Sequence, residues 1–258
     1  MRILMPSIVD PGARSGASTV TRNLIRLLES PPLSASVECV AIPRTTGTRH
    51  RIRQAAAVAR SIISSLPAKV AYTHSHDFRR RVLERATPKH ADVVMINGSD
   101  LLWLVPMLPA GLPRFLIVHN IEYELFESQI GRIRKTFPLI QPFLQRQCQR
   151  LKRDEQEGMR RVGNAIFLST VDAQRAEEAG LTSANIIVPP LFGESVVRHN
   201  RQARSGSGLE LGFLGNLHWW PNREGLSWFL QAVLPNITRP IHLNVFGEGA
   251  VPAVPDGV

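Results

Sequence analysis

Short apolar runs alternate with helical patterns along the chain, and this alternation restricts the possible folds. Residues 2–8 form an apolar run of strand length, and residues 20–28 then repeat Val and Leu at helical spacing until Pro31 and Pro32. Alternating strands and helices favour an α/β fold whose mostly parallel sheet is covered on both faces. The strands expected in the first part of the chain are 2–8, 37–42, 91–96, 115–118, 165–168 and 185–188.

The segments between these runs carry helical patterns of different character. Residues 51–66 predict a basic amphipathic helix, residues 137–161 a long polar helix that Pro142 could kink, and residues 169–172 the start of a helix that ends at Gly180. Shorter helices are expected over 78–86 and 101–105. The apolar side of the 51–66 helix is expected to consist of Ile52, Ala56, Ala59, Ile63 and Leu66.

The pattern stops and starts again near residue 200. Residues 194–208 are rich in Arg, Ser and Gly without an apolar period, which is typical of a linker. A strand at 209–214, a helix at 222–234 and a strand at 241–246 are expected after it. The sequence therefore predicts a Rossmann-like domain over 1–193, a linker over 194–208 and the opening part of a second Rossmann-like domain over 209–258.

The chain is basic, with 31 Lys and Arg against 21 Asp and Glu, and the excess is concentrated in residues 44–90 and 132–161. Ordinary solvated helix faces, an anionic membrane surface or phosphate-bearing lipid, and nucleic acid would each account for such surfaces. No zinc-finger spacing, RNA-binding aromatic motif or helix-turn-helix signature is present. We therefore expect no nucleic-acid partner and keep peripheral contact with an anionic membrane as an expectation.

The cysteines and the hydropathy pattern indicate the cellular compartment. Cys39 and Cys148 stand far apart without a CxxC pattern, so neither a disulfide framework nor a zinc site is expected. The N-terminal run is too short for a signal peptide, and the apolar stretch 101–118 is interrupted by three prolines. We therefore expect a cytoplasmic protein whose stretch 101–118 forms a short helix, a loop and a strand.

Polar residues that follow strands are the first candidates for a site, because ligands bind at the carboxyl ends of strands in open parallel sheets. The turn after the first strand contains Gly12, Ser15 and Gly16 before a helix, an arrangement that could receive an anion at the helix N-terminus. Its spacing matches neither GxGxxG nor a P-loop. An ordinary strand-to-helix turn explains the loop equally well.

Two further loops carry candidates. His119, Asn120 and Glu122 follow the strand at 115–118, where a histidine could exchange a proton or bind a substrate hydroxyl, although a lone loop histidine is more often only solvated. Gly215 ends the strand at 209–214, and Asn222 and Arg223 lie in the first turn of the next helix, where a positive helix end and a guanidinium would suit a diphosphate.

At these residues the sequence resembles the family-four glycosyltransferases, enzymes of the two-domain GT-B fold. The resemblance spans nearly the whole chain in the order expected for that family. The matching segments are the turn 12–18, His119 to Glu122, residues 168–172, residues 187–193, Phe213 to Gly215, Pro221 with Asn222, and residues 228–235.

The resemblance implies a retaining transferase that moves a sugar from a nucleotide-sugar to a glycan or lipid-linked acceptor, in cell-surface polysaccharide biosynthesis, without a metal or cofactor. It implies that His119 contacts the transferred sugar and that Gly12 and Gly16 line the acceptor side. Two departures stand out: Asn216 follows Gly215 where many relatives have Arg, and the family's acidic donor-binding motif would fall after Val258. We therefore expect a truncated chain that binds donor weakly and turns over slowly or not at all. A non-catalytic GT-B remnant that acts as a binding module, and more remotely a GT-B-type epimerase, are the alternatives.

Overall fold

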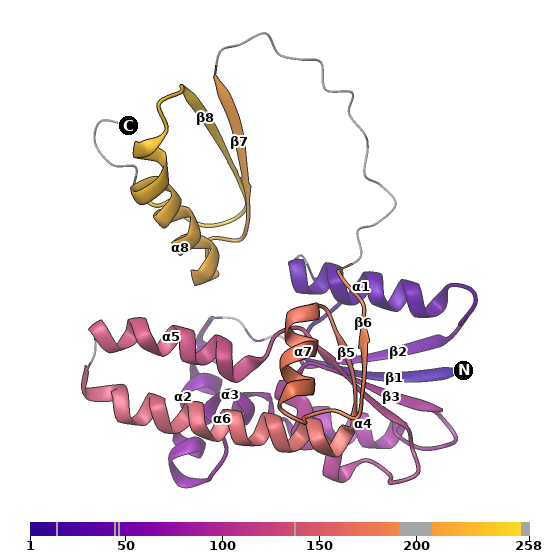
Figure 1. Cartoon of the computed structure of the whole chain (residues 1–258). Coiled ribbons are helices and arrows are strands. Elements are labelled where there is room, and N and C mark those ends of the chain that lie inside the picture. The colour runs from indigo at the N-terminus through magenta and orange to yellow at the C-terminus, as the bar shows by residue number, and fades with distance from the viewer. Residues whose placement is uncertain (14, 44, 46, 137, 191–207, 254–258) are drawn as a thin grey trace. The chain divides into compact units, whose positions relative to one another are not determined.

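The computed structural model describes residues 1–253 except 14, 44, 46, 137 and 191–207. The chain forms two compact units, Met1–Glu194 (unit 1) and Ser195–Val258 (unit 2), which Figure 1 shows in indigo to orange and in orange to yellow. The expected linker 194–208 lies outside the described residues except for Gly208.

Unit 1 is built on one six-stranded sheet in which every neighbouring pair is parallel (Figure 1). The strand order is β2-β1-β3-β4-β5-β6, and each strand begins within two residues of its expected position. The strands are β1 (Arg2–Ser7), β2 (Ser36–Ala41), β3 (Val93–Asn97), β4 (Arg114–Val118), β5 (Asn164–Phe167) and β6 (Ala184–Ile187).

The strand order reverses between β1 and β3. The chain proceeds from β1 to β2 on one side and then crosses to β3 on the other side of β1. Such a reversal opens a crevice at the carboxyl edge of a parallel sheet, where ligands bind in this class of fold. The register places Ser7, the last residue of β1, opposite Asn97, the last residue of β3. Two polar side chains thus meet at the switch point of the sheet.

Serine side chains mark several helix starts in unit 1. Ser15 accepts a hydrogen bond from the backbone N–H of Ser18, and Ser169 accepts one from Asp172, which confirms the helix start expected at 169–172. The helices are α1 (Gly16–Glu29), α2 (Gly47–Ile63), α3 (Ala68–Thr73), α4 (His76–Arg85), α5 (Glu122–Thr136), α6 (Gln141–Val162) and α7 (Thr170–Glu178), with 3₁₀ turns η1 (Ser99–Met107) and η2 (Pro138–Ile140).

The sheet carries a hydrophobic core on each face. Leu116 belongs to one buried cluster together with Phe78 and Phe167, whereas the next residue, Ile117, belongs to a second cluster with Met5. Neighbouring strand residues point to opposite faces, so a strand buried on both sides must be apolar throughout. The predicted α/β class with a Rossmann-like parallel sheet is confirmed.

Three helical details differ from the sequence predictions. Pro142 lies in the first turn of α6, where its missing N–H costs nothing, instead of kinking a longer helix. Helices α3 and α5 were not predicted. In α2, whose first turn lies before the predicted start, Ala57 and Ser61 are buried, whereas Ile52 and Ile63 of the expected apolar side are 64% and 89% exposed.

Unit 2 is a strand–helix–strand segment. Strands β7 (Leu209–Leu214) and β8 (Ile241–Phe246) pair in parallel, as the sequence predicts. Helix α8 (Trp220–Trp228) joins them and continues through a π turn, η3 (Phe229–Val233), and a 3₁₀ turn, η4 (Leu234–Asn236). Its buried hydrophobic cluster consists of Leu217, Leu226 and Leu230.

The apolar stretch 101–118 forms η1, a loop and β4, as predicted. Across the described parts of the chain, no helix combines the length and the apolar character needed to cross a membrane.

Candidate functional site

A chain of buried hydrogen bonds joins the carboxyl ends of β1, β3 and β4. The side chain of Asn97 donates from Nδ2 to Ser7 Oγ at 2.8 Å and to Thr21 Oγ1 at 3.1 Å. Its Oδ1 lies 2.6 Å from Nε2 of His119, which directly follows β4. Asn97, Ser7 and Thr21 are all fully buried, so this network fixes the orientation of the His119 ring.

The network also sets the tautomer of His119. Because both amide hydrogens of Asn97 are engaged by hydroxyl oxygens, its Oδ1 is the acceptor and His119 Nε2 is the donor. The other ring nitrogen, Nδ1, is then an acceptor as long as the ring is neutral. Burial lowers the pKa of His119, and the nearby Glu122 carboxylate only partly opposes this. The ring can therefore accept a hydrogen bond from a hydroxyl at neutral pH.

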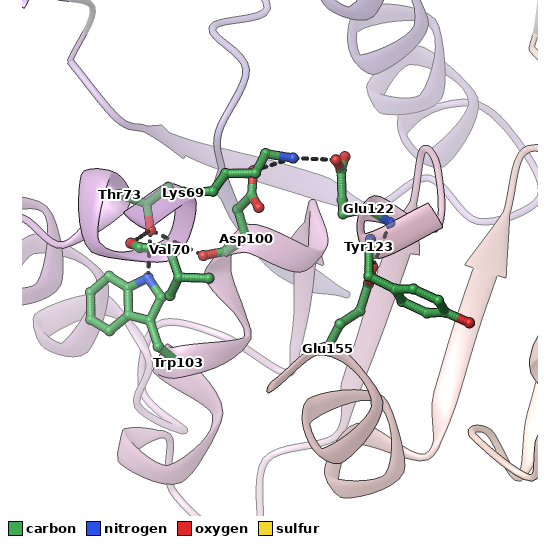
Figure 2. Close-up of polar contacts among 8 residues, drawn as sticks. All are labelled: Lys69, Val70, Thr73, Asp100, Trp103, Glu122, Tyr123 and Glu155. Atoms are coloured by element: carbon green, nitrogen blue, oxygen red, sulfur yellow. Dashed lines mark hydrogen bonds and ion pairs between the residues drawn. The ribbon is translucent and has the colours of Figure 1, made fainter. Parts of the chain in front are cut away.

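A lysine between two carboxylates lies at the same edge (Figure 2). Lys69 of α3 approaches Asp100 Oδ2 at 3.3 Å and forms an ion pair with Glu122 at the start of α5. Burial lowers the pKa of Lys69, but the two carboxylates outweigh it and the pKa is raised overall. Burial raises the pKa of Asp100 despite Lys69, and its buried Oδ1 has no hydrogen-bond partner among the described residues.

The backbone that carries these groups is held by neighbours. Glu155 of α6 accepts hydrogen bonds at 3.0 Å from the backbone N–H groups of both Glu122 and Tyr123, so it caps α5 from another helix (Figure 2). Burial raises the pKa of Glu155 to about 7, although the two N–H donors partly offset this. The Thr73 hydroxyl shares its one proton between the carbonyls of Val70 at 2.7 Å and Asp100 at 3.0 Å, and it accepts from Trp103 Nε1 at 2.9 Å.

A pocket of about 620 Å³ opens beside Lys69 and Asp100. Its apolar wall includes Ile8 and Ile42, which directly follow β1 and β2. Tyr72 lies in its wall too, and the Tyr72 hydroxyl is 2.9 Å from His50 Nδ1. The pocket therefore has the composition of a small-molecule site, apolar walls with a few polar groups.

The predicted loop residues of the first turn have mostly local partners. Ser15 caps α1, and the N–H of Gly12 donates to Asp10 Oδ1 at 2.8 Å. A Cβ at Gly16 would meet no atom of the described residues within 4 Å, so these residues leave the space beside this helix end open. Asn120 is exposed directly after His119.

The remaining predicted residues belong to unit 2. Asn222 Nδ2 donates to the carbonyl of Asn216 at 3.1 Å, and a Cβ at Gly215 would lie 2.8 Å from that same Nδ2. Arg223 is exposed in the first turn of α8. Asn222 and Gly215 therefore shape the turn after β7.

The structure thus brings His119 and Glu122 to one edge of the unit 1 sheet. Sequence reasoning missed five contributors to this edge: Ser7, Lys69, Asn97, Asp100 and Glu155. Ser7 and Asn97 end strands and Asp100 lies three residues after the end of β3, and this signal could have found them. Within the described residues, no three His, Cys, Asp or Glu side chains gather as metal ligands would.

Comparisons with protein families, curated proteins and solved structures found similarity only to solved structures. No protein-family model and no curated protein matches the chain. Among solved structures, the glycotransferase of kitacinnamycin aligns with a TM-score of 0.42 and 14% identity over 99% of this chain and 69% of its own. A UDP-glucosyltransferase from Polygonum tinctorium, capable of glucosylating indoxyl and solved with 3,4-dichloroaniline, aligns with a TM-score of 0.43 and 11% identity over 94% of this chain and 65% of its own.

Proposed function

We propose that the chain is a GT-B-type retaining glycosyltransferase related to family four. It would transfer a sugar from a nucleotide-sugar to a glycan or lipid-linked acceptor in cell-surface polysaccharide biosynthesis. The observation that carries the proposal is His119, which burial keeps neutral and which the hydrogen bond to Asn97 holds at the carboxyl edge of the sheet. The sequence resemblance assigns contact with the transferred sugar to this same histidine.

The site residues have distinct proposed roles. His119 Nδ1 accepts a hydrogen bond from a sugar hydroxyl and thereby orients the ring. The open helix end at Gly12, Ser15 and Gly16 faces the acceptor or a phosphate, and Asn120 and Glu122 complete the sugar side of the site. In unit 2, the turn that holds Gly215, Asn222 and Arg223 binds the donor diphosphate, with Arg223 supplying the cation.

No metal or cofactor is part of this proposal. The departing diphosphate is instead stabilised by helix N-termini and basic side chains. We place the reaction in the cytoplasm, at the inner face of the membrane, where a lipid-linked acceptor would be presented.

The test measures nucleotide release by the whole chain from a panel of nucleotide-sugars, with and without a mixture of glycan and lipid-linked acceptors. We expect acceptor-dependent release at a slow rate, because Asn216 stands where many relatives have Arg. His119→Ala should lower it at least about tenfold, equivalent to about 1.4 kcal/mol. The matched control is His90→Ala, because His90 is an exposed histidine in the same unit. Unchanged release in the His119 variant would remove this residue from the site.

The same assay separates the alternatives. A chain that binds nucleotide-sugars by calorimetry but never releases nucleotide would be a binding module. Inversion of a sugar stereocentre without acceptor, found by product analysis, would indicate an epimerase. His119→Ala also leaves the buried Oδ1 of Asn97 without its donor, so we expect a stability loss of about 1–3 kcal/mol. His119→Gln, which keeps an N–H donor, controls for this loss.

A further inference from the structure

Helix α2 faces solvent with its apolar side. Ile52, Ile62 and Ile63 are 64%, 67% and 89% exposed, and Ala55, Ala56 and Ala59 between them are exposed as well, whereas Ala57 faces the protein. These positions recur at spacings of three, four and seven residues, so they form one continuous stripe. The α2 face is defined here as Ile52, Ala55, Ala56, Ala59, Ile62 and Ile63.

The opposite, polar side of α2 attaches the helix to the protein. Arg53 donates from Nε to the carbonyl of Tyr72 at 3.0 Å and stacks over the Tyr72 ring at 4.6 Å. Ser61 is fully buried, and its carbonyl accepts a hydrogen bond from Arg150 at 2.5 Å. The exposure of the apolar side is therefore built into the packing, because the polar side is committed to specific partners.

Arginines border the α2 face. Arg51 lies along one margin of the stripe, and Arg49 and Arg60 lie along the other by helical spacing. Within the described parts of the chain, none of these three guanidinium groups has a carboxylate partner. An apolar stripe between cationic margins is the pattern of helices that lie in the interface of anionic membranes.

A cationic pocket of about 190 Å³ adjoins this helix. Arg60 of α2 and Arg79 of α4 line it together with Ser75 and His76, and none of the described residues in its wall is acidic. His74 forms its inner wall, where Nε2 is buried without a hydrogen-bond partner among the described residues. Burial, together with the charges of Arg60 and Arg79, lowers the pKa of His74 to about 4. Two guanidinium groups without a carboxylate partner among the described residues, beside the unpartnered His74 Nε2, match a phosphate group.

We propose that the α2 face and this arginine pocket form a docking surface for an anionic phospholipid bilayer. The isoleucines enter the interface between headgroups and acyl chains, and the pocket receives a headgroup phosphate. Charge complementarity selects the occupant: the stripe needs an apolar partner and the surrounding arginines need a dense array of anions, and an anionic bilayer supplies both. This inference deepens the proposed membrane location, and its test reads vesicle binding, so it can fail independently of sugar transfer.

The experiment is flotation of the whole chain with vesicles of phosphatidylcholine alone or with about one-third phosphatidylglycerol. We expect binding to the anionic vesicles and little to the neutral ones. The triple variant Ile52→Ser, Ile62→Ser, Ile63→Ser should bind at least about tenfold more weakly while unfolding normally, because all three side chains are exposed. The matched control is Leu33→Ser, Val171→Ser, Ile187→Ser, which removes three other exposed aliphatic residues.

Two neighbouring arginines test the pocket. Arg79→Gln and Arg80→Gln remove the same charge from the same helix, but Arg80 is paired with Asp77 and Glu84 and is not part of the pocket wall. Arg79→Gln should weaken anionic vesicle binding about fivefold, and Arg80→Gln should weaken it less. Equal loss in both, full binding by the isoleucine variant, or no preference for anionic vesicles would overturn the proposal.

Two further outcomes would also overturn it. Saturable binding of inorganic phosphate to the pocket, abolished by Arg79→Gln and without vesicle binding, would assign the site to a soluble phosphate. Retention of an acidic protein on the α2 face without vesicle binding would assign the surface to a protein partner.

Discussion

Phe167 and Phe246 occupy equivalent places in the two units, because each is the last residue of a parallel strand. Phe167 is completely buried, whereas Phe246 is 57% exposed. Both strands were predicted from the same kind of apolar run. The comparison shows that an apolar run fixes a strand locally, whereas burial of its side chains depends on how many further layers pack against the sheet.

Unit 1 has those layers and unit 2 has fewer. The six strands of unit 1 carry a buried cluster on each face, whereas the two strands of unit 2 share the cluster of Leu217, Leu226 and Leu230. Leu214 at the end of β7 and Trp228 at the end of α8 are 85% and 62% exposed. We therefore expect the same substitution to have very different costs in the two units.

The largest difference is expected for the two phenylalanines. Phe167→Ala should lower the free energy of unfolding by about 3–5 kcal/mol, because it removes a fully buried ring and leaves a cavity. Phe246→Ala should cost less than about 1 kcal/mol, because most of the ring already contacts water. Urea unfolding of the whole chain measures both, and equal costs would show that the two strand ends have the same environment in solution.

The next largest effect tests the small cluster itself. Leu226 is 1% exposed, and Leu226→Ala should cost about 2–4 kcal/mol within unit 2. Hydrogen exchange should then accelerate in β7 and β8 and stay unchanged in β3 and β4, because units of different stability open separately. Accelerated exchange in all four strands would instead mean that the two units unfold together.

The third effect depends on pH and concerns a carboxyl group buried in unit 1. The pKa of Glu155 is raised from 4.5 to about 7, so the folded state binds this proton more tightly than the unfolded state. Its contribution to stability is complete below about pH 4.5 and is lost as the pH rises through about 7, at most about 3 kcal/mol.

Glu155→Gln should remove this dependence, although it weakens the cap on α5 at every pH. The measurement is the difference between wild type and variant in chemical unfolding from about pH 5 to about pH 8. The lowered pKa of His119 makes stability rise with pH, opposite to the effect of Glu155. This contribution is the same in both proteins, so the difference between them isolates Glu155. A difference that stays constant with pH would contradict the raised pKa.

The strands and their order along the chain could be predicted because strands buried on both faces must be apolar throughout. His119 could be proposed as a site residue because polar groups at strand ends lie in the crevice of such sheets. Lys69 and Glu155 gave no such signal, since each lies on a helix and reaches the site only through packing between elements.

The orientation of α2 shows a different limit. Its apolar stripe was predicted from the period, but the period does not say whether a stripe faces core or solvent. The pairing of Arg53 with Tyr72 and of Arg150 with Ser61 decides this, and both pairs join residues distant in sequence. The partners of the polar side therefore place the stripe toward solvent.

The smallest expected effect concerns the glycines of the two equivalent turns. Gly16 begins α1 with open space beside it, so Gly16→Ala should stabilise the chain by about 0.4–1 kcal/mol. At Gly215 a Cβ would lie 2.8 Å from Asn222 Nδ2, so Gly215→Ala should cost about 1–3 kcal/mol instead.

Thermal unfolding measures the stability of both glycine variants. The nucleotide-release assay then tests whether a ligand occupies the open space beside Gly16. A Gly16→Ala protein that is more stable yet releases nucleotide more slowly would mean that a ligand approaches the backbone there. A protein that is more stable and equally active would leave Gly16 as part of an ordinary turn. At Gly215 the two measurements do not distinguish a ligand contact from packing, because the contact with Asn222 already explains why a glycine is needed there. The contrast therefore separates a turn shaped by its own side chains from a turn that is open to a ligand.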